Sequence, residues 1–564
     1  MTLRRYDYGL VVEAPVLSRG LSVVRLGVDV AVAREPGGLP DEGRPIIPKD
    51  QIRGMLWHVL RDLEGEAFVL NWFGSKSTDP LNTPRPGKVH FTDLRAETPE
   101  DAFGDATRIA IDDMTGAVAE GHLVTIEQPW PVGHLVTFRG SFYIEGGGSA
   151  LVRAIGEALT VLPAIGAFKS AGFGRVDAAI SPTDVPSAAQ ASAVGLVVDR
   201  HCELELEIHE PFCVDTERLD NNLFRGRPVI PGGAVKAVLA RWLGDVPTLW
   251  QKLDSHLEAI HVGHARPTTP EMAAPSVAVP RSLVIDESGA VHDLFQESVA
   301  ADCGALRFQV DWKDKEWSAL PGHYRQLEFD RDARTRTSVD WEKSGAKPGE
   351  LFSISSIVPR PGMRWVSTLR FPDALPATVI DALVDELHGA VLAGLGRTDA
   401  VLTVRVRQSA LPGKVIERSA AGQVVVCLET PALLFDHAAL AAVNWDAQAA
   451  YRAYWQERGL DLIEAIADQQ LQGGHIAIRY PPGQLRDPAA TLYEPYILTL
   501  PGAVFKLRIA DTDEAALQAL LDGGLPLPNP LRGQANWRTC PFLPTNGYGE
   551  CRTVRQGEHR GGRP

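Results

Sequence analysis

The sequence of 564 residues contains few cysteines and no long hydrophobic run. Its six cysteines include no Cys-x-x-Cys pair, so neither a disulfide framework nor a closed zinc site is indicated. His261 and His264 have the spacing of two metal ligands, with Cys202 or Cys303 as possible companions, but the missing paired motif favours ordinary loop histidines. Without a membrane-spanning stretch or a signal-peptide core, we expect a cytoplasmic protein.

An excess of basic residues is also missing. Lysine and arginine number 56 against 71 acidic residues, and the net charge of −15 excludes a protein that coats nucleic acid by charge alone. It does not exclude RNA binding, which depends on where the basic residues lie. Hydrophobic content of 45% is typical of a folded protein, and the length predicts three or four domains.

A set of short motifs occurs twice, in the same order and with closely matched spacing. Arg108 and Gly133 are 25 residues apart, and Arg336 and Gly362 are 26 apart. The repetition predicts a duplicated domain. The first set consists of Asp29 and Arg34, Ile47-Pro48-Lys49 with Arg53, Arg108 and Asp112, Pro131 to Gly133, and Gly172 to Arg175; the second consists of Asp220 and Arg225, Ile230 to Gly232 with Lys236, Arg336 and Asp340, Arg360 to Gly362, and Gly394 to Arg397.

Strands and helices alternate in each half. Apolar residues recur at helical spacing, and residues 202–208 alternate with the period of a strand. This order predicts an α+β fold of tandem ferredoxin-like domains, similar to RNA-recognition motifs, with an insertion in each domain. The predicted helices span 48–63, 149–161, 231–243 and 376–392.

Composition sets the expected boundaries. We predict a first domain over 1–180, a linker over 181–196, a second domain over 197–407, a degenerate third domain over 408–553 and a disordered basic tail over 554–564. The third domain lacks the Ile-Pro helix start and the Asp-to-Arg loop, so we expect it to keep the fold and lose the chemistry. Its matching segments are 424–428, 497–502 and 547–550.

The basic residues of each set flank backbone that suits phosphate. A Gly-x-Gly turn lets backbone amides approach a phosphate, and the arginine after it adds a bidentate partner. A helix start offers unpaired amides and a positive dipole end beside Lys49, Arg53 and Lys236. The alternatives are a plain tight turn and a surface helix with solvated basic side chains.

Asp29 and Asp220 each lie in a predicted loop before the basic helix. A carboxylate beside an RNA backbone is unfavourable unless it performs chemistry or pairs with a cation. It can deprotonate or orient a ribose 2′-hydroxyl, or help to hold a hydrated magnesium ion. The alternative is a salt bridge to the arginine five residues on. Asp215 is a competing candidate in the second set.

At these residues the chain resembles the RAMP superfamily, the repeat-associated proteins of CRISPR–Cas systems, and most of all the backbone subunits of type III effector complexes. The resemblance covers 1–407 as two fused copies and 408–564 more faintly. It rests on the loop aspartate, the Ile-Pro helix start and the terminal glycine turn, each present twice.

The resemblance implies that each domain clasps the backbone of a guide RNA. The insertions with Arg108 and Arg336 would form thumb hairpins that push between guide–target base pairs. The family's catalytic aspartate maps onto Asp29 and Asp220, so the complementary target RNA would be cut twice, with a divalent metal such as Mg²⁺, alongside other effector subunits. The RNA-binding candidates are Lys49, Arg53, Gly172, Gly174, Arg175, Lys236, Gly394, Gly396, Arg397, Arg108 and Arg336.

The chain departs from the family pattern in several places. The first copy has Ile-Pro-Lys-Asp instead of Ile-Pro-Gly-Ser, and the fused copies fit subtype III-D better than single-copy subunits. An alternative that the resemblance implies for the third domain is similarity to the family's paralogues that bind the five-prime handle. An inert guide-binding scaffold is the main alternative function. A guide-processing endonuclease is less favoured because no histidine occupies matching positions in the two copies.

Overall fold

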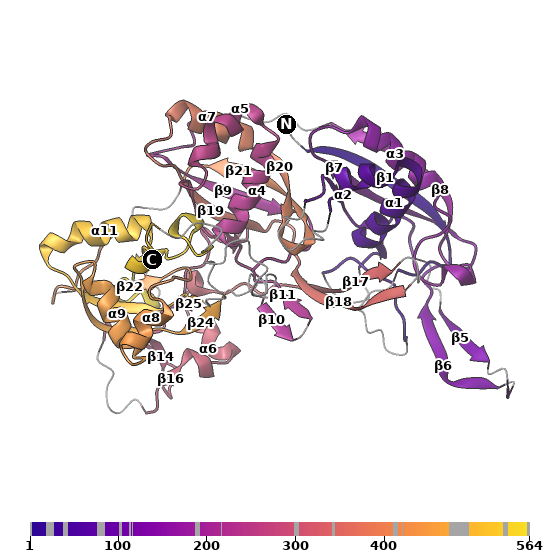
Figure 1. Ribbon diagram of the computed structural model, residues 1–564. Helices are drawn as coiled ribbons and strands as arrows, with labels where there is room; N and C mark the ends of the chain where they lie inside the picture. The colour runs from indigo at the N-terminus through magenta and orange to yellow at the C-terminus, as the bar shows by residue number, and fades with distance from the viewer. Residues whose placement is uncertain are drawn as a thin grey trace.

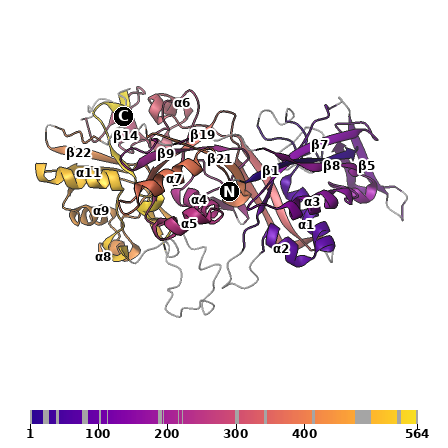
Figure 2. The same cartoon turned by 90° about the horizontal axis from the view of Figure 1, so that it is seen from above.

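Three α+β units follow one another along the chain and lie in a row (Figure 1), which Figure 2 shows from above. The computed structural model describes residues 3–18, 28–37, 43–75, 85–100, 104–111, 114–115, 117–186, 192–193, 195–215, 217–220, 222–297, 304–340, 345–409, 415–419, 421–472, 496–533 and 540–560. No helix in these ranges is long and apolar enough to cross a membrane.

The first unit packs its helices on an antiparallel sheet whose order is β2-β4-β7-β1-β8, with β3 also on β7. Tyr6, Tyr8, Leu10 and Val12 of the central strand β1 are buried, because alternate side chains of a strand point to the same face. Its elements are β1 (Arg4–Glu13), β2 (Ile46–Ile47), α1 (Lys49–Glu64), α2 (Glu66–Phe73), β3 (Val89–Phe91), β4 (Leu94–Ala96), β5 (Asp105–Ile111), β6 (Val118–Glu127), β7 (Leu135–Ile144), α3 (Ser149–Thr160) and β8 (Arg175–Val185).

The second unit repeats this topology with the sheet order β12-β19-β9-β21-β20. Its helix α4 buries Val235, Val238, Leu239 and Trp242 in the core, as the helical spacing predicts. Its elements are β9 (His201–Ile208), β10 (Glu217–Asp220), β11 (Leu223–Arg225), α4 (Gly232–Gly244), α5 (Pro247–Leu253), β12 (His261–Val262), β13 (Arg266–Thr268), β14 (Leu283–Ile285), β15 (Val291–Asp293), β16 (Arg307–Phe308), α6 (Asp314–Ser318), β17 (Arg331–Asp340), β18 (Gly345–Ile357), β19 (Arg364–Arg370), α7 (Ala377–Leu387), β20 (Val391–Leu395) and β21 (Ala400–Arg407).

The third unit has the corresponding order β23-β26-β22-β27. Every unit therefore places its first strand between its third and fourth strands, which is the ferredoxin-like arrangement, and the predicted α+β fold is confirmed. Its elements are β22 (Gln423–Leu428), α8 (His437–Ala442), α9 (Ala447–Gln456), β23 (Asp461–Ile466), β24 (Gln469–Gln472), β25 (Tyr496–Thr499), β26 (Val504–Arg508), α11 (Glu514–Gly523) and β27 (Cys551–Thr553).

Each unit carries a hairpin inserted between its second and third sheet strands. We call β5–β6 the first hairpin, β17–β18 the second and β24–β25 the third. The first hairpin projects away from all three units, whereas the second lies beside the first unit (Figure 1).

Three predicted boundaries differ from the structure. Residues 181–185, assigned to the linker, continue β8 and pair with β1. The predicted helix 376–392 ends at Leu387, because Gly389 has a φ of +80° and starts the turn into β20. The tail is not disordered over 554–560, because Glu558 and His559 are buried there, and Glu558 bonds Arg552 and Tyr324.

Candidate nucleic-acid interface

Asp29 lies against the base of the first hairpin. Its backbone N–H donates to the carbonyl oxygen of Thr125 at 2.9 Å, and its carboxylate accepts a hydrogen bond from the backbone N–H of Thr125 at 2.7 Å. Val30 extends the contact through a β-bridge to Ile126. The residue itself is exposed. The hairpin therefore holds the carboxylate in one place while solvent reaches it.

Arg34 is engaged elsewhere. Its guanidinium forms a buried ion pair with Glu127 and a bidentate pair with Glu100 at 2.6 and 2.8 Å. Although burial opposes its charge, the hydrogen bonds to these two glutamates raise the pKa of Arg34. The structure therefore does not contain the alternative salt bridge between Asp29 and Arg34, because Arg34 pairs with other carboxylates.

The sequence predicts a loop at Asp220, but the structure places this residue in a strand. It ends β10 and pairs with Leu223 of β11, which runs parallel to the second hairpin at Ser353. Ser353 precedes Gly362 by nine residues, and Thr125 precedes Gly133 by eight. The two aspartates therefore lie at corresponding levels of their hairpins. The side chain of Asp220 is outside the described residues, as are Asp112 and the side chain of Asp340.

Asp215, the competing candidate, adopts a φ of +44° and lies 3.7 Å from Arg227. Arg227 also donates to Gln470 of the third hairpin at 3.2 Å. Asp215 thus belongs to a contact between the second and third units rather than to the β10–β11 pair.

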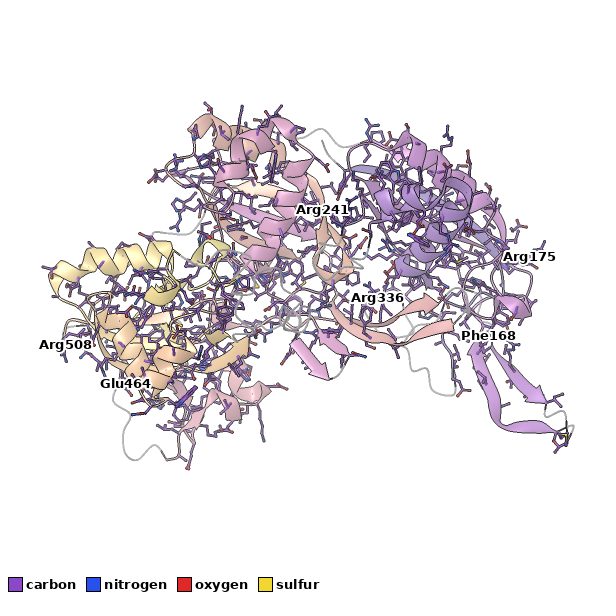
Figure 3. The ribbon with its side chains drawn as sticks, in the orientation of Figure 1. Phe168, Arg175, Arg241, Arg336, Glu464 and Arg508 are labelled. Atoms are coloured by element: carbon purple, nitrogen blue, oxygen red, sulfur yellow. The ribbon has the colours of Figure 1, made fainter. Side chains whose placement is uncertain are left out.

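The hairpin arginines meet the glycine turns of their own units. Arg108 lies over the rings of Phe168 and Phe173, at 4.8 and 5.8 Å from the ring centres. Arg336 donates to the carbonyl oxygen of Arg397 at 3.3 Å. Figure 3 labels Phe168 near the base of the first hairpin, with Arg175 on the same unit. Motifs far apart in the sequence therefore form one surface in each unit.

The two glycines of each turn have different surroundings. A Cβ on Gly174 would lie 1.8 Å from the carbonyl oxygen of Ile165, and one on Gly396 would lie 2.3 Å from that of Cys213. A Cβ on Gly172 would meet nothing within 4 Å, whereas one on Gly394 would lie 2.7 Å from Arg241. Close packing explains Gly174, Gly394 and Gly396, and only Gly172 leaves space for a ligand backbone.

The arginine that follows each of these turns is exposed. The Arg175 side chain is 72% exposed and lies 3.6 Å from Glu13. Arg397 is exposed and lies over the ring of Phe224, 4.4 Å from its centre. Both present a guanidinium that can take a bidentate phosphate.

The basic residues at the helix starts are used inside the protein. Lys49 forms a buried ion pair with Glu210 of the second unit, and Arg53 donates to the carbonyl oxygen of Phe73 at 2.6 Å. Lys236 donates to the carbonyl oxygen of Thr545 at 2.8 Å, and burial lowers its pKa to about 8. The predicted phosphate role does not fit these contacts, because each side chain bonds protein atoms at or near a unit boundary.

The third unit directs its glycine turn at the second unit. Glu550, in place of the arginine, lies 3.2 Å from His261, and the ring of His264 meets Tyr548 at 4.7 Å. Burial lowers the pKa of His264 to about 4. The histidine pair thus packs against the third unit, and the described residues contain no group of three or more His, Cys, Asp or Glu side chains fit to hold a metal. Cys303 lies outside them.

Sequence reasoning missed the aromatic members of the two surfaces. Phe168, Phe173 and Phe224 place ring faces under Arg108 and Arg397. Phe168 precedes the first glycine turn and Phe173 lies within it, and an aromatic residue in or beside a Gly-x-Gly-Arg motif is a signal that could have identified them.

Comparison with known proteins finds one family match, which lies in the first unit. Residues 37–177 match the RAMP superfamily model. A chain in a cryo-EM structure of the Type III-B Cmr-beta bound to cognate target RNA and AMPPnP is 10% identical, with a TM-score of 0.33, over 56% of this chain and 93% of that one. A chain in a second structure of Cmr-beta with cognate target RNA is 12% identical, with a TM-score of 0.29, over 54% and 86%. No curated protein sequence matches. The match over 37–177 identifies a RAMP superfamily domain in the first unit of the chain.

Proposed function

We propose that the chain is an RNA-binding subunit of a type III CRISPR effector, which binds guide RNA along its first two units and cleaves complementary target RNA at Asp29 and Asp220. The family match over 37–177 and the twofold motif set support this proposal. The partners are guide RNA, target RNA and other effector subunits, in keeping with the target RNA bound in the Cmr-beta structures.

The observation that carries the cleavage proposal is the position of Asp29. Its carboxylate is exposed and anchored to the Thr125 amide, and its sequence neighbour Arg34 pairs with Glu127 and Glu100. Because Arg34 does not pair with it, the anchored carboxylate of Asp29 is suited to accept the proton of a ribose 2′-hydroxyl while that hydroxyl attacks the adjacent phosphate. The 5′-oxygen leaves with a proton from solvent, so charge and atoms balance.

A divalent ion fits this site only in a hydrated form. Asp29 offers one carboxylate, and among the described residues no cluster of three acidic, histidine or cysteine side chains exists. Magnesium often keeps several waters and binds through one or two carboxylates plus substrate phosphates. Asp29 would hold such an ion together with the RNA, and the ion would supply neutralisation of the phosphate charge.

The guide backbone is proposed to pass the exposed guanidinium groups of Arg175 and Arg397 and the open space beside Gly172. The two guanidinium groups supply positive charge, and contacts of this kind position phosphates without reading base sequence. The acidic net charge is compatible with this arrangement, because the cations are local.

The test is cleavage of a labelled, guide-complementary RNA by the assembled effector with magnesium. We expect the wild type to cut and the Asp29→Ala/Asp220→Ala double variant to bind target with unchanged affinity but leave it intact. If the double variant cuts as the wild type does, the chain is an inert guide-binding scaffold.

A further inference from the structure

The two proposed cleavage sites are anchored in different ways, and the first is held by its own unit. The backbone N–H and the carboxylate of Asp29 both bond Thr125 of the first hairpin. Two residues later on the same strand, the Glu127 carboxylate accepts a hydrogen bond from the N–H of Val32 at 2.9 Å and pairs with Arg34. Every one of these contacts lies inside the first unit.

Asp220 is attached to the second hairpin by strand pairing. It pairs with Leu223 of β11, and β11 runs parallel to β18, where Leu223 lies beside Ser353. Asn222 reinforces this attachment, because its carbonyl oxygen accepts the N–H of Ser353 at 2.8 Å and its side chain donates to the carbonyl oxygen of Leu351 at 2.8 Å. The position of the second hairpin therefore sets the position of the Asp220 backbone.

The second hairpin is in turn held by the first unit, beside which it lies in Figure 1. Arg334 of β17 crosses the unit boundary and forms a bidentate pair with Asp93 at 2.7 and 3.0 Å. The two side chains are only 20% and 14% exposed. The next residue, Thr335, pairs with Ser353 of β18, and their hydroxyl oxygens lie 2.7 Å apart. A short run of contacts thus leads from Asp93 to the strand that carries Asp220.

Asp93 is a fixed point for this hairpin. Its carboxylate accepts a hydrogen bond from the backbone N–H of Lys49 at 2.8 Å, at the start of α1. Although burial opposes its charge, Arg334 and this N–H lower the pKa of Asp93 to about 2, so the carboxylate is ionised at neutral pH. The second cross-boundary pair, between Arg336 and Asp50 at 2.7 Å, involves a carboxylate that is 42% exposed, and solvent weakens such a pair.

We propose that Asp93 of the first unit is a positioning residue for RNA cleavage at Asp220 of the second unit, acting through Arg334 and the second hairpin. Reacting groups must be held in a narrow geometry, and a displacement of about 1 Å can lower a rate about 100-fold. Without the Asp93 pair, the second hairpin loses its buried anchor, whereas the contact between Asp29 and Thr125 is untouched. The first unit therefore controls the second cut separately from its own. This proposal rests on the proposed function.

The test measures the single-turnover rate of each target-RNA product from the guide-loaded effector with magnesium. Asp93→Asn removes the charge but keeps an oxygen for the Lys49 N–H. We expect the product that depends on Asp220 to form about tenfold or more slowly. The product that depends on Asp29 should form at the wild-type rate, and target affinity should be unchanged.

The variant is expected to fold, because Arg334 keeps Asp332 as a partner at 2.6 Å. Arg334→Lys is a second, milder variant that keeps the positive charge but cannot form the bidentate pair. It should slow the same product, by a smaller factor, and leave the other one alone. Glu97→Gln is the matched control, because Glu97 directly follows β4 of the first unit and pairs with Arg139 of the same unit. Both products should form normally in this control.

The outcomes separate positioning from a general structural role. Selective slowing of the Asp220 product in Asp93→Asn and in Arg334→Lys supports the proposal. Equal slowing of both products, or normal rates for both, overturns it. Absence of both products from the wild-type effector would count against the proposed function instead.

Discussion

Lys49 of the first unit and Glu210 of the second form an ion pair across the boundary between the two units, with side chains that are only 12% and 8% exposed. They are 161 residues apart in the sequence. Together with the Arg334–Asp93 and Arg336–Asp50 pairs, this contact fixes the second hairpin and the start of α1 relative to each other. The first two units therefore present their surfaces in one orientation.

Breaking that pair should destabilise the protein. Lys49→Met leaves the Glu210 carboxylate buried without its partner, which costs about 3–5 kcal/mol of unfolding free energy. Urea denaturation followed by tryptophan fluorescence measures the change. The Lys49→Met/Glu210→Leu double variant should recover most of the loss, and an unchanged midpoint for the single variant would contradict a buried pair.

The boundary should also respond to pH through His90. Its Nδ1 lies 2.6 Å from Asp399, its Nε2 lies 3.0 Å from Glu145, and Arg241 lies beside both carboxylates. Although burial and Arg241 oppose protonation, the two carboxylates raise the pKa of His90 above 6.5. Figure 3 labels Arg241 at this boundary.

A raised pKa in the folded state means that protonated His90 stabilises the fold. The contribution is complete below the unfolded value of 6.5 and is lost as pH rises through the higher folded value. Thermal midpoints of the wild type should therefore fall, relative to His90→Gln, as the pH rises above 6.5. His437→Gln, at an exposed position, serves as the control, and parallel profiles for wild type and His90→Gln would refute this role.

The two glycines of the first turn should separate fold from RNA binding. Gly174→Ala places a Cβ 1.8 Å from the Ile165 carbonyl oxygen and should cost about 3 kcal/mol or more. Gly172→Ala meets open space, so only the strain of its φ of +86° applies, about 1–2 kcal/mol. If the guide backbone passes Gly172, the second variant also weakens RNA binding. Equal stability losses for the two variants would contradict the packing described.

Much of the fold follows from local patterns, whereas long-range pairing does not. The helix starts after Ile-Pro at α1 and α4 agree with the sequence, because proline suits the entry to a helix and the apolar spacing is regular. The partners of Lys49 and Lys236 could not be predicted, because Glu210 and Thr545 reach them only through the packing of whole units.

The tail and the β10–β11 pair show the same limit. Composition predicts a disordered basic end, yet Glu558 is buried because Arg552 and Tyr324 bind its carboxylate. The Asp220 segment is polar and reads as a loop, but β11 gains strand pairing from β18, more than a hundred residues later. The aspartate and glycine motifs were visible because they repeat, not because any single copy is distinctive.

The exposed arginines should contribute affinity rather than stability. Arg175→Ala and Arg397→Ala each remove one proposed phosphate contact, so each should weaken guide binding for every guide sequence and lower the salt slope by about one. Filter binding at several salt concentrations measures both quantities. Arg153→Ala, which removes a 74% exposed arginine on α3, is the matched control and should leave the slope unchanged.

The most direct measurement is the pattern of target-RNA products from the guide-loaded effector with magnesium for wild type, Asp29→Ala and Asp220→Ala. One active aspartate in each of the first two units predicts two cuts in the wild type, with each single variant losing a different one and keeping the other. Identical products from all three proteins, with target still bound, would contradict the account.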